Sequence, residues 1–462
     1  IKGEGRMEVV YKAYGWLHLT IKRILGKSKK VKFKMVDFRT DLSVQNTRET
    51  WFNDMRIQKG FCRLVKSQAF PVENVVENNM FYELQLSFQG KRHKHKRGIV
   101  EADAVKKWKS FIEKAKIPDG YRNSGLCYAG YIMDCESWCL PSWIWTNAAI
   151  IRVLCKEDLA QALEMTDKIL GLQCECGGWV VRNDYSENGM VPMLAPNDSA
   201  YLANNALLSV YKITKKSQYL IAAEKCADWI IETARNDGLV WVGMNIREGQ
   251  WIQKNNIVDI GFTAGLFAEL YILTEKERYK NYLKKFTDTY IKLFLKTDGS
   301  FATGLNEKDE QIGGAFGRGQ AWALEGLIPA YQVLKTDELR STIEGIVANL
   351  LKKQNKSGGW PYNLNRTLLG LDCKATSIIG TSLIEWYPYS SNREGIKKAV
   401  NNAIHWCLKN TIDDESEAGG GIFSYCMEGA IVHHLYTSTA FVYSSAYAIE
   451  MLKMSKYMGE HK

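Results

Sequence analysis

The sequence has 462 residues, of which 46% are hydrophobic and 24% charged, a globular composition that excludes a disordered or fibrous chain. Its net charge of +10 is unevenly distributed, because residues 1–100 hold 21 Lys and Arg against 9 Asp and Glu. The remaining residues are close to neutral, and since they contain no recognisable nucleic-acid-binding module, we expect no nucleic-acid partner. No apolar run reaches the length of about 18 residues that a membrane-spanning helix requires.

The first hundred residues form a basic N-terminal extension, which we expect to be partly helical. Residues 7–25 fit an amphipathic helix, and basic runs follow it and occupy residues 91–97. Such runs are usually solvated loops, and weak association with anionic surfaces is the alternative. The start lacks the apolar core of a secretory signal, so a cytoplasmic location is predicted. The sequence does not define the oligomeric state.

The 11 cysteines are mostly isolated along the chain. In a long chain without a secretory signal, we expect them to be reduced thiols rather than disulfides. Their spacing fits no usual zinc motif, so no metal and no other cofactor is predicted.

Glycines recur along residues 101–462 with a period near sixty. The marks are Gly120, Gly178, Gly238, Gly299, Gly359 and Gly420. Amphipathic helical patterns precede them, for example at 217–235, 277–296 and 336–355. Helical runs rich in small residues and nearly free of Lys and Glu follow them, at 145–154, 198–211, 259–273, 318–334, 372–386 and 437–452.

Each repeat therefore provides one solvent-facing helix and one buried helix. Six such pairs predict an all-α fold, an (α/α)6 toroid over residues 101–462, with residues 1–100 as an extension. An open solenoid is the alternative, although it normally requires capping units at its ends.

Charged residues stand at the starts of four successive inner helices: Asp198, Asp259, Arg318 and Asp372. Because the repeats are equivalent, these starts should lie at one end of the barrel. Asp is also a preferred helix N-cap, which is the structural alternative for each of the aspartates. Arg318 does not fit that explanation, because a cation opposes the dipole at a helix N-terminus. A guanidinium beside carboxylates suits the capture of an acidic substrate.

Tryptophans also gather in the segments that lead to the inner helices. Trp145, Trp241, Trp322 and Trp360 are therefore candidate sugar-binding residues, since aromatic rings beside carboxylates are typical of sugar sites. The alternative is that they fill the core between helices. We favour that alternative for Trp229 and Trp406, which fall on outer helices.

The stretch from Gly317 to Leu324 (GRGQAWAL) resembles the RGQAW motif of the unsaturated glucuronyl hydrolases, glycoside hydrolase family 88, which are related to the rhamnogalacturonyl hydrolases. Residues 360–362 (WPY) and 371–377 (LDCKATS) are similar to later elements of that family. Residues 257–260 (IVDI) and 196–201 (PNDSAY) resemble two earlier ones. The likeness covers about residues 101–460.

The resemblance implies an (α/α)6 enzyme that removes a 4,5-unsaturated uronic acid from an oligosaccharide by hydrating the vinyl ether of the ring. It implies Asp259 as the general acid and base and Asp198 as the carboxylate that tunes it. Arg318 would bind the substrate carboxylate, and Trp322 and Trp360 would wall the sugar. We add Gln320, Asp372, Trp145 and Trp241 to the expected substrate-binding residues.

The sequence departs from the family pattern at three points. Residues 303–314 contain no His, and Asn197 stands where the family often has His. After Asp259, the family usually has a Met-Asn run, whereas this sequence has Gly261-Phe262-Thr263. One alternative is a toroid that processes uronates without this hydrolysis, such as an epimerase, or that only binds glycans. A more distant alternative is an isoprenoid-type toroid enzyme, which Asp372-Cys373 with His433 or His434 faintly suggests at the wrong spacing.

Overall fold

The computed structural model describes residues 95–462 apart from 120–122, 134–136, 140–142, 187–188, 247–248, 253–255, 366–369, 429–434 and 460–462. Before residue 95 it describes only the antiparallel backbone pair β1 (Met35–Val36) and β2 (Glu49–Thr50). The helix predicted at 7–25, the first glycine mark at Gly120 and the residues His433 and His434 lie outside the described residues.

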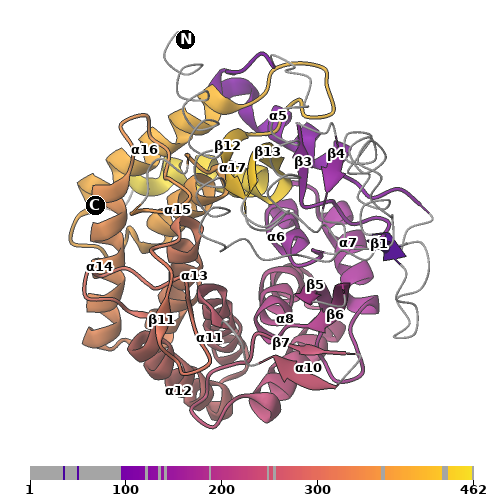
Figure 1. The fold of residues 1–462 in the computed structure, drawn as a ribbon, viewed down its shortest axis with the longest axis vertical. Helices are drawn as coiled ribbons and strands as arrows, with labels where there is room; N and C mark the ends of the chain where they lie inside the picture. The colour runs from indigo at the N-terminus through magenta and orange to yellow at the C-terminus, as the bar shows by residue number, and fades with distance from the viewer. Residues whose placement is uncertain are drawn as a thin grey trace, which may run out of the picture.

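The described part of the chain is an (α/α)6 toroid with an inner and an outer ring of helices (Figure 1). The inner ring comprises α6 (Thr146–Glu157), α8 (Pro196–Leu202) with the π-helical turn η1 (Ala203–Leu208) and α9 (Ser209–Thr214), the 3-10 turn η2 (Val258–Gly261) with α11 (Phe262–Thr274), α13 (Gly317–Leu334), α15 (Cys373–Trp386) and α17 (Val442–Ser455). The outer ring comprises α5 (Glu101–Lys114), α7 (Leu159–Gly171), α10 (Ser217–Thr233), α12 (Glu277–Phe294), α14 (Asp337–Lys353) and α16 (Arg393–Asn410). A 3-10 turn, η4 (Lys456–Gly459), follows α17. The structure thus confirms the predicted toroid.

Each inner helix is covered mainly by the outer helix that follows it in the chain, as α7 covers α6 and α12 covers α11. Three of these connections are tight turns with a left-handed residue, Lys215, Glu275 and Lys335, at φ of 57°, 55° and 49°. The last inner helix, α17, packs against α5 and α6. The ring is therefore closed by contacts between the two ends of the helical region, which excludes the open solenoid.

The glycine period reflects this packing. Gly177, Gly238, Gly299, Gly358 and Gly420 have positive φ, which L-residues rarely adopt. A Cβ at each of these positions would also meet the next outer helix, most closely at Gly358, where it would lie 2.1 Å from the Asn402 carbonyl oxygen of α16. At Gly420 the corresponding atom is the carbonyl oxygen of Lys107 in α5, at 2.2 Å. The last glycine of the series therefore helps to close the ring.

Short antiparallel strands lie at the end of the ring where the inner helices begin, which we call the mouth. One sheet has the order β12-β13-β3-β4, from Phe423–Glu428, Leu435–Phe441, Gly130–Ile132 and Ser137–Cys139. A second has the order β5-β6-β7-β8, from Val180–Ser186, Gly189–Leu194, Gly243–Asn245 and Gln250–Ile252. A third joins β11 (Gln311–Ile312), β10 (Gly304–Leu305) and β9 (Asn256–Ile257). The sequence predicts these segments as irregular, because strands of two to seven residues give no clear alternating pattern.

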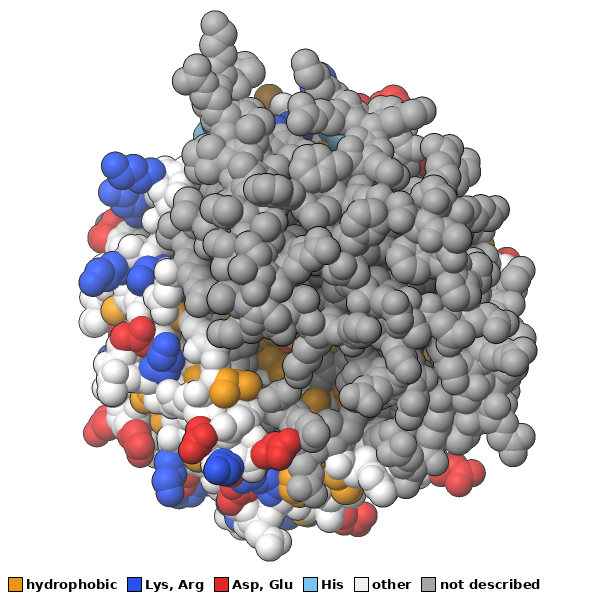
Figure 2. Space-filling view, in the orientation of Figure 1, with side chains coloured by type: hydrophobic (Ala, Val, Ile, Leu, Met, Phe, Trp, Pro, Cys, Tyr) orange, Lys and Arg blue, Asp and Glu red, His pale blue; other side chains and the backbone are white. Residues whose placement is uncertain are grey.

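Residues 95–99 pack against the ring, so part of the second basic run belongs to the toroid. Gly98 donates its N–H to the Thr411 carbonyl at 2.9 Å, and Lys96 pairs with Asp413 at 2.6 Å. The rest of that run lies outside the described residues. On the face shown in Figure 2, Lys/Arg and Asp/Glu side chains are interspersed along the described edge of the ring, as the near-neutral composition predicts. Within the part that the structure describes, no helix has the length and apolarity that crossing a bilayer requires.

Candidate active site at the mouth of the barrel

The start of α13 makes two close contacts, one with backbone and one with a side chain, that leave no room for a Cβ. A Cβ on Gly317 would lie 2.3 Å from the Pro361 carbonyl oxygen, and one on Gly319 would lie 2.5 Å from a methyl carbon of Val258. The N–H of Gly317 also donates to the Tyr362 carbonyl at 2.8 Å. Arg318 is therefore fixed between the neighbouring repeats on both sides of α13.

The guanidinium of Arg318 is buried, with 4% of the residue exposed. It donates from Nη1 to the Tyr443 hydroxyl at 3.0 Å. Its Cζ lies 4.8 Å from the ring centre of Phe316 and 5.1 Å from that of Trp322. The two rings and the phenol thus fix the position of the guanidinium at this end of the barrel.

The two candidate carboxylates are also buried at the mouth. Asp198 lies in the first turn of α8 and is 1% exposed, and Asp259 lies in the turn η2 and is 7% exposed. The Asn197 amide donates to Asp198 Oδ1 at 3.1 Å. Asn197 thus contacts Asp198 from the position where the family pattern often has His.

Five aromatic rings form a floor across the barrel. Ring centres lie 4.3 Å apart for Tyr201 and Phe262, 5.6 Å for Phe262 and Trp322, 5.8 Å for Trp145 and Tyr201, and 5.5 Å for Trp145 and Tyr443. Four of them lie in α8, α11, α13 and α17, and Trp145 is the residue directly before α6. Trp145 and Trp322, two of the candidate sugar-binding residues, therefore belong to one cluster.

This floor indicates that three of the four predicted charged residues share one rim. Asp198 precedes Tyr201 by three residues, Asp259 precedes Phe262 by three and Arg318 precedes Trp322 by four. Residues at these spacings lie one turn apart on the same helix face. Because the three rings are in contact, the three charged residues lie one turn above the floor, towards the mouth.

Tyr290 of α12 borders the Asp259 turn. Its hydroxyl donates to the Val258 carbonyl at 2.6 Å, and burial together with the nearby Asp259 charge raises the tyrosine pKa well above its ordinary value. The phenol is therefore neutral at physiological pH. A Cβ on Gly261 would lie 2.8 Å from this hydroxyl and 3.1 Å from the Trp322 carbonyl oxygen, which explains a glycine directly after this turn.

Two predicted substrate contacts, Gln320 and Trp360, lie instead in the scaffold. The Gln320 amide accepts from the Phe301 N–H at 2.7 Å and donates to the Phe301 carbonyl at 2.9 Å. Trp360 is fully buried, and its indole donates to the Leu350 carbonyl of α14 at 2.9 Å.

The repeats explain these two placements. Trp179, three repeats before Trp360, makes the equivalent contact. Its indole N–H donates to the Ile169 carbonyl at 2.8 Å. The backbone N–H of Trp179 donates to Ser199 and that of Trp360 to Thr376, as the Phe301 N–H donates to Gln320. Ser199, Gln320 and Thr376 are each the fourth residue of an inner helix. Gln320 and Trp360 thus make scaffold contacts that recur from repeat to repeat, and we leave both out of the proposed substrate contacts.

Asp372 follows the structural alternative for helix starts. Its carboxylate caps α15 by accepting from the Lys374 N–H at 3.0 Å, and the Lys374 ammonium lies 3.3 Å away in a fully buried pair. That ammonium also lies 3.9 Å from the centre of the Phe441 ring. We therefore treat Asp372 as a capping residue rather than a substrate ligand.

Trp241 stands apart from the aromatic floor. Its ring lies 5.8 Å from the guanidinium of Arg235, which itself binds Asp309 at 2.8 Å. In the same 303–314 segment, the Gln311 amide donates to the carbonyls of Leu293 and Leu295. The segment therefore offers neither a His nor this Gln amide to a substrate.

The isoprenoid alternative requires a metal site at Asp372-Cys373. Cys373 is buried, and this burial is the main cause that raises the pKa of its thiol. The charge of Asp372 raises the same pKa further. Among the described residues, no group of three or more His, Cys, Asp or Glu could hold a metal ion. The described cysteines are free thiols.

Sequence reasoning missed Tyr443 and Lys374, which contact Arg318 and Asp372. Both occupy the first turn of an inner helix, so the rule that selected Arg318 could have found Lys374. No local sequence pattern identifies Tyr443, because its partner Arg318 is 125 residues away in the sequence.

Comparisons with known proteins agree with this architecture. The family model for Glycosyl Hydrolase Family 88 matches residues 179–455. A search of curated protein sequences finds no significant match.

Several solved structures share the fold. An unsaturated glucuronyl hydrolase specific for heparin has a TM-score of 0.60 at 16% identity, over 78% of this chain and 96% of that one. The unsaturated glucuronyl hydrolase of Streptococcus agalactiae has a TM-score of 0.58 at 15% identity, over 79% and 94%. That of Bacillus sp. GL1, responsible for the degradation of glycosaminoglycan, has a TM-score of 0.54 at 14% identity, over 67% and 85%.

Proposed function

The chain belongs to glycosyl hydrolase family 88 and is a glycoside hydrolase, and we propose that it removes a 4,5-unsaturated uronic acid from the non-reducing end of an oligosaccharide. One observation carries the proposal: Arg318 is held above the aromatic floor on the same rim as Asp198 and Asp259. A uronate offers an anionic carboxylate for the guanidinium and a ring face for the aromatic residues.

The proposed reaction is a hydration rather than a displacement at the anomeric carbon. Asp259 donates a proton to C4 of the C4=C5 bond, and positive charge develops at C5 and the ring oxygen. The resulting carboxylate of Asp259 takes a proton from the water that adds at C5. The product is a hemiketal, which opens to a ketone at C5, and C1 then releases the aglycone alcohol and becomes an aldehyde.

The surrounding groups have distinct parts in this scheme. Arg318 holds the C5 carboxylate and so orients the double bond towards Asp259. Asp198, the second carboxylate of the rim, stabilises the developing positive charge. Trp322 and Trp145 contribute apolar surface for the sugar and exclude bulk water from the site.

The test is incubation with unsaturated disaccharides produced by lyases from heparin, chondroitin and pectin. Turnover removes the ultraviolet absorbance of the C4=C5 bond, and we expect this loss with at least one of the three. Asp259→Asn should abolish the loss while binding of the disaccharide persists. Asp288→Asn, on the exposed face of α12, is the matched control and should retain wild-type turnover. Wild-type turnover by Asp259→Asn would contradict the mechanism.

A second candidate is an enzyme or binding protein for saturated uronates. The placement of Gln311 and the absence of His in the 303–314 segment favour it, because the family pattern draws a His and a Gln from that segment. Binding of saturated glucuronides by the folded protein, with no absorbance loss from any unsaturated disaccharide, would favour this candidate.

A further inference from the structure

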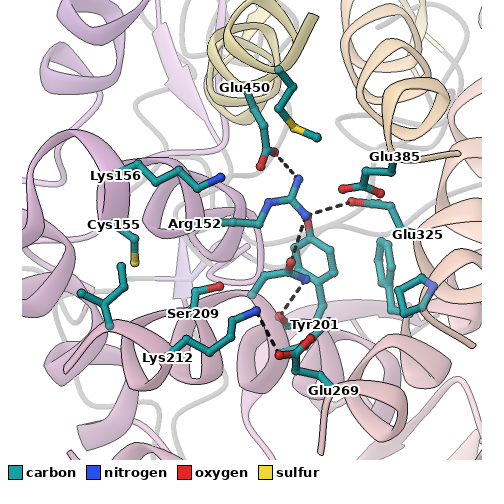
Figure 3. A pocket seen from close by; sticks show the side chains of 16 residues that line it. Arg152, Cys155, Lys156, Tyr201, Ser209, Lys212, Glu269, Glu325, Glu385 and Glu450 are labelled. Carbon is teal, nitrogen blue, oxygen red and sulfur yellow. Dashed lines mark hydrogen bonds and ion pairs between the residues drawn. The ribbon is translucent and has the colours of Figure 1, made fainter. Parts of the chain in front are cut away.

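A cavity lies at the end of the barrel opposite the mouth, which we call the base, where the inner helices end. Its volume is about 360 Å³, and residues from all six inner helices line it. Figure 3 shows the side chains that point into it, with Arg152 at the centre. The rings of Tyr201 and Phe262, which also belong to the aromatic floor, border it. The cavity and the mouth are therefore separated by one layer of aromatic rings.

Arg152 is the central cation of the base cavity and is engaged on several sides. It donates to Glu450 at 2.5 Å and to the Asn205 amide oxygen at 3.0 Å. Its guanidinium lies 5.0 Å from the ring centre of Tyr447 and 3.8 Å from Glu325. The Glu450 carboxylate is the partner that neutralises this guanidinium most directly.

Glu325 has only one oxygen occupied. Its Oε1 accepts a hydrogen bond from the Tyr447 hydroxyl, which is in turn hydrogen-bonded to the Tyr201 hydroxyl. Its Oε2 is buried without a hydrogen-bond partner among the described residues, and the side chain is only 7% exposed. A buried polar atom without a hydrogen-bond partner is costly, so this oxygen on the cavity wall is a candidate contact for a ligand.

Glu385 adds a third carboxyl group to the cavity. No described residue forms a hydrogen bond or ion pair with it, although it lines the cavity beside Arg152 and Glu450. The three carboxyl groups thus face one central guanidinium. At the rim, Lys212 is paired with Glu269 at 3.0 Å, and Lys156 is the further cation that lines the cavity.

We propose that the base cavity is a binding site for a small organic cation with a primary ammonium group, held between Glu325 and Glu385. An ammonium supplies the donors that Glu325 Oε2 and Glu385 lack, and its charge offsets the surplus of carboxylates. The rings of Tyr201 and Phe262 can contact the carbon skeleton of such a ligand. The π-helical turn η1 carries the lining residues Asn204 and Asn205, and such turns are frequent at functional sites.

The protonation of the site makes binding depend on pH. Burial is the main cause of the raised pKa of both carboxyls, which is about 8 for Glu325 and about 7 for Glu385. The titratable groups that line the cavity with these two carboxyls, or contact them, are Arg152, Cys155 and Lys156 from α6, Tyr201 from α8, Lys212 from α9, Glu269 from α11, and Tyr447 and Glu450 from α17. An alkylammonium stays protonated to about pH 10. Its affinity should therefore rise between pH 6 and 9, as the two carboxyls ionise.

The experiment is calorimetric titration of the full chain with n-propylammonium chloride, with 1-propanol as the neutral probe and sodium propionate as the anionic one. We expect saturable binding of the ammonium alone, with an affinity at least tenfold higher at pH 9 than at pH 6. Glu385→Gln should weaken this binding at least tenfold, because one charged hydrogen bond is lost. The same loss is expected for Glu325→Gln.

Glu269→Gln is the matched control, since this carboxylate lines the same cavity but is already paired with Lys212. It should change the affinity by less than about twofold. No binding of the ammonium by the folded protein, equal affinity in Glu385→Gln, or preference for propionate would each overturn the proposal. Saturable binding of Ca²⁺ that competes with the ammonium would also overturn it, since the site would then be a metal site.

Discussion

The two ends of the barrel each place one arginine beside carboxylates, and they differ in what surrounds that arginine. At the mouth, Arg318 is oriented by Tyr443 and by the ring of Trp322. At the base, Arg152 is bound directly by Glu450 and lies near Glu325. Charge composition alone would therefore not distinguish the two sites.

The connections between helices distinguish them instead. At the mouth, each outer helix leads to the next inner helix through a long segment, and short strands join neighbouring repeats. At the base, tight turns such as those at Lys215 and Glu275 connect inner to outer helices. Long connecting segments can vary without disturbing the ring, so catalytic and binding groups concentrate there. The comparison thus favours the mouth for chemistry.

The largest expected effect separates the two ends by replacing one carboxylate in each. Asp198→Asn should lower kcat by about a thousandfold with little change in stability, because the proposed charge stabilisation is lost. Glu450→Gln should instead lower the free energy of unfolding by about 3 kcal/mol, because Arg152 stays buried without its closest partner. Steady-state kinetics and urea unfolding measure the two effects. A purely structural effect of Asp198→Asn would break the comparison.

Arg318→Lys tests whether the mouth arginine recognises a carboxylate. Lys keeps the charge but lacks the planar fork, so KM for a uronate substrate should rise about ten- to a hundredfold, with a smaller change in kcat. Initial rates over a range of substrate concentrations separate the two constants. Arg278→Lys, on the exposed face of α12, provides the control and should leave both unchanged. A fall in kcat alone would argue for a different role of Arg318.

Glu325→Gln tests the electrostatics of the base through stability. A carboxyl with a folded pKa of about 8 stays protonated in the folded state while the unfolded chain ionises near pH 4.5. Its contribution is full below pH 4.5 and declines as pH rises towards 8. Gln cannot ionise, so the variant should gain on the order of 2 kcal/mol relative to the wild type between pH 6 and 9. Urea unfolding at both pH values measures the difference, and a constant difference would contradict the raised pKa.

Trp360→Phe should have the smallest effect. Phe keeps most of the buried ring but cannot donate to the Leu350 carbonyl, so the free energy of unfolding should fall by about 1 kcal/mol. Trp179→Phe should behave alike, because Trp179 makes the equivalent contact. Neither variant should change KM. A raised KM for Trp360→Phe alone would return this residue to the substrate site.

The sequence predicts the toroid well because its main signal is a packing requirement repeated five times in the described residues. Each left-handed glycine lies against an outer helix, so the period records the geometry of the ring. The sequence assigns Trp360 and Gln320 to the substrate site because scaffold residues occupy the same positions in the repeat as candidate site residues do. The equivalent contacts of Trp179 and Ser199 were visible only in three dimensions.

The base cluster was missed for another reason. Arg152, Glu325, Glu385 and Glu450 come from four different helices, and no local motif joins them. A signal does exist, since these are charged residues within helices otherwise nearly free of charge. Such isolated charges on buried helices point towards one another when the helices form a ring.

The closure of the ring has a consequence for biosynthesis. Trp108 of α5 donates to Thr411 at 2.9 Å across 303 residues of sequence, and Gly420 lies against the backbone of the same helix. This helix also packs against α17, so its partners in the ring are among the last segments to be translated. Because α17 also carries Tyr443, the hydrogen bond that orients Arg318 can form only once this last inner helix has taken its place in the ring.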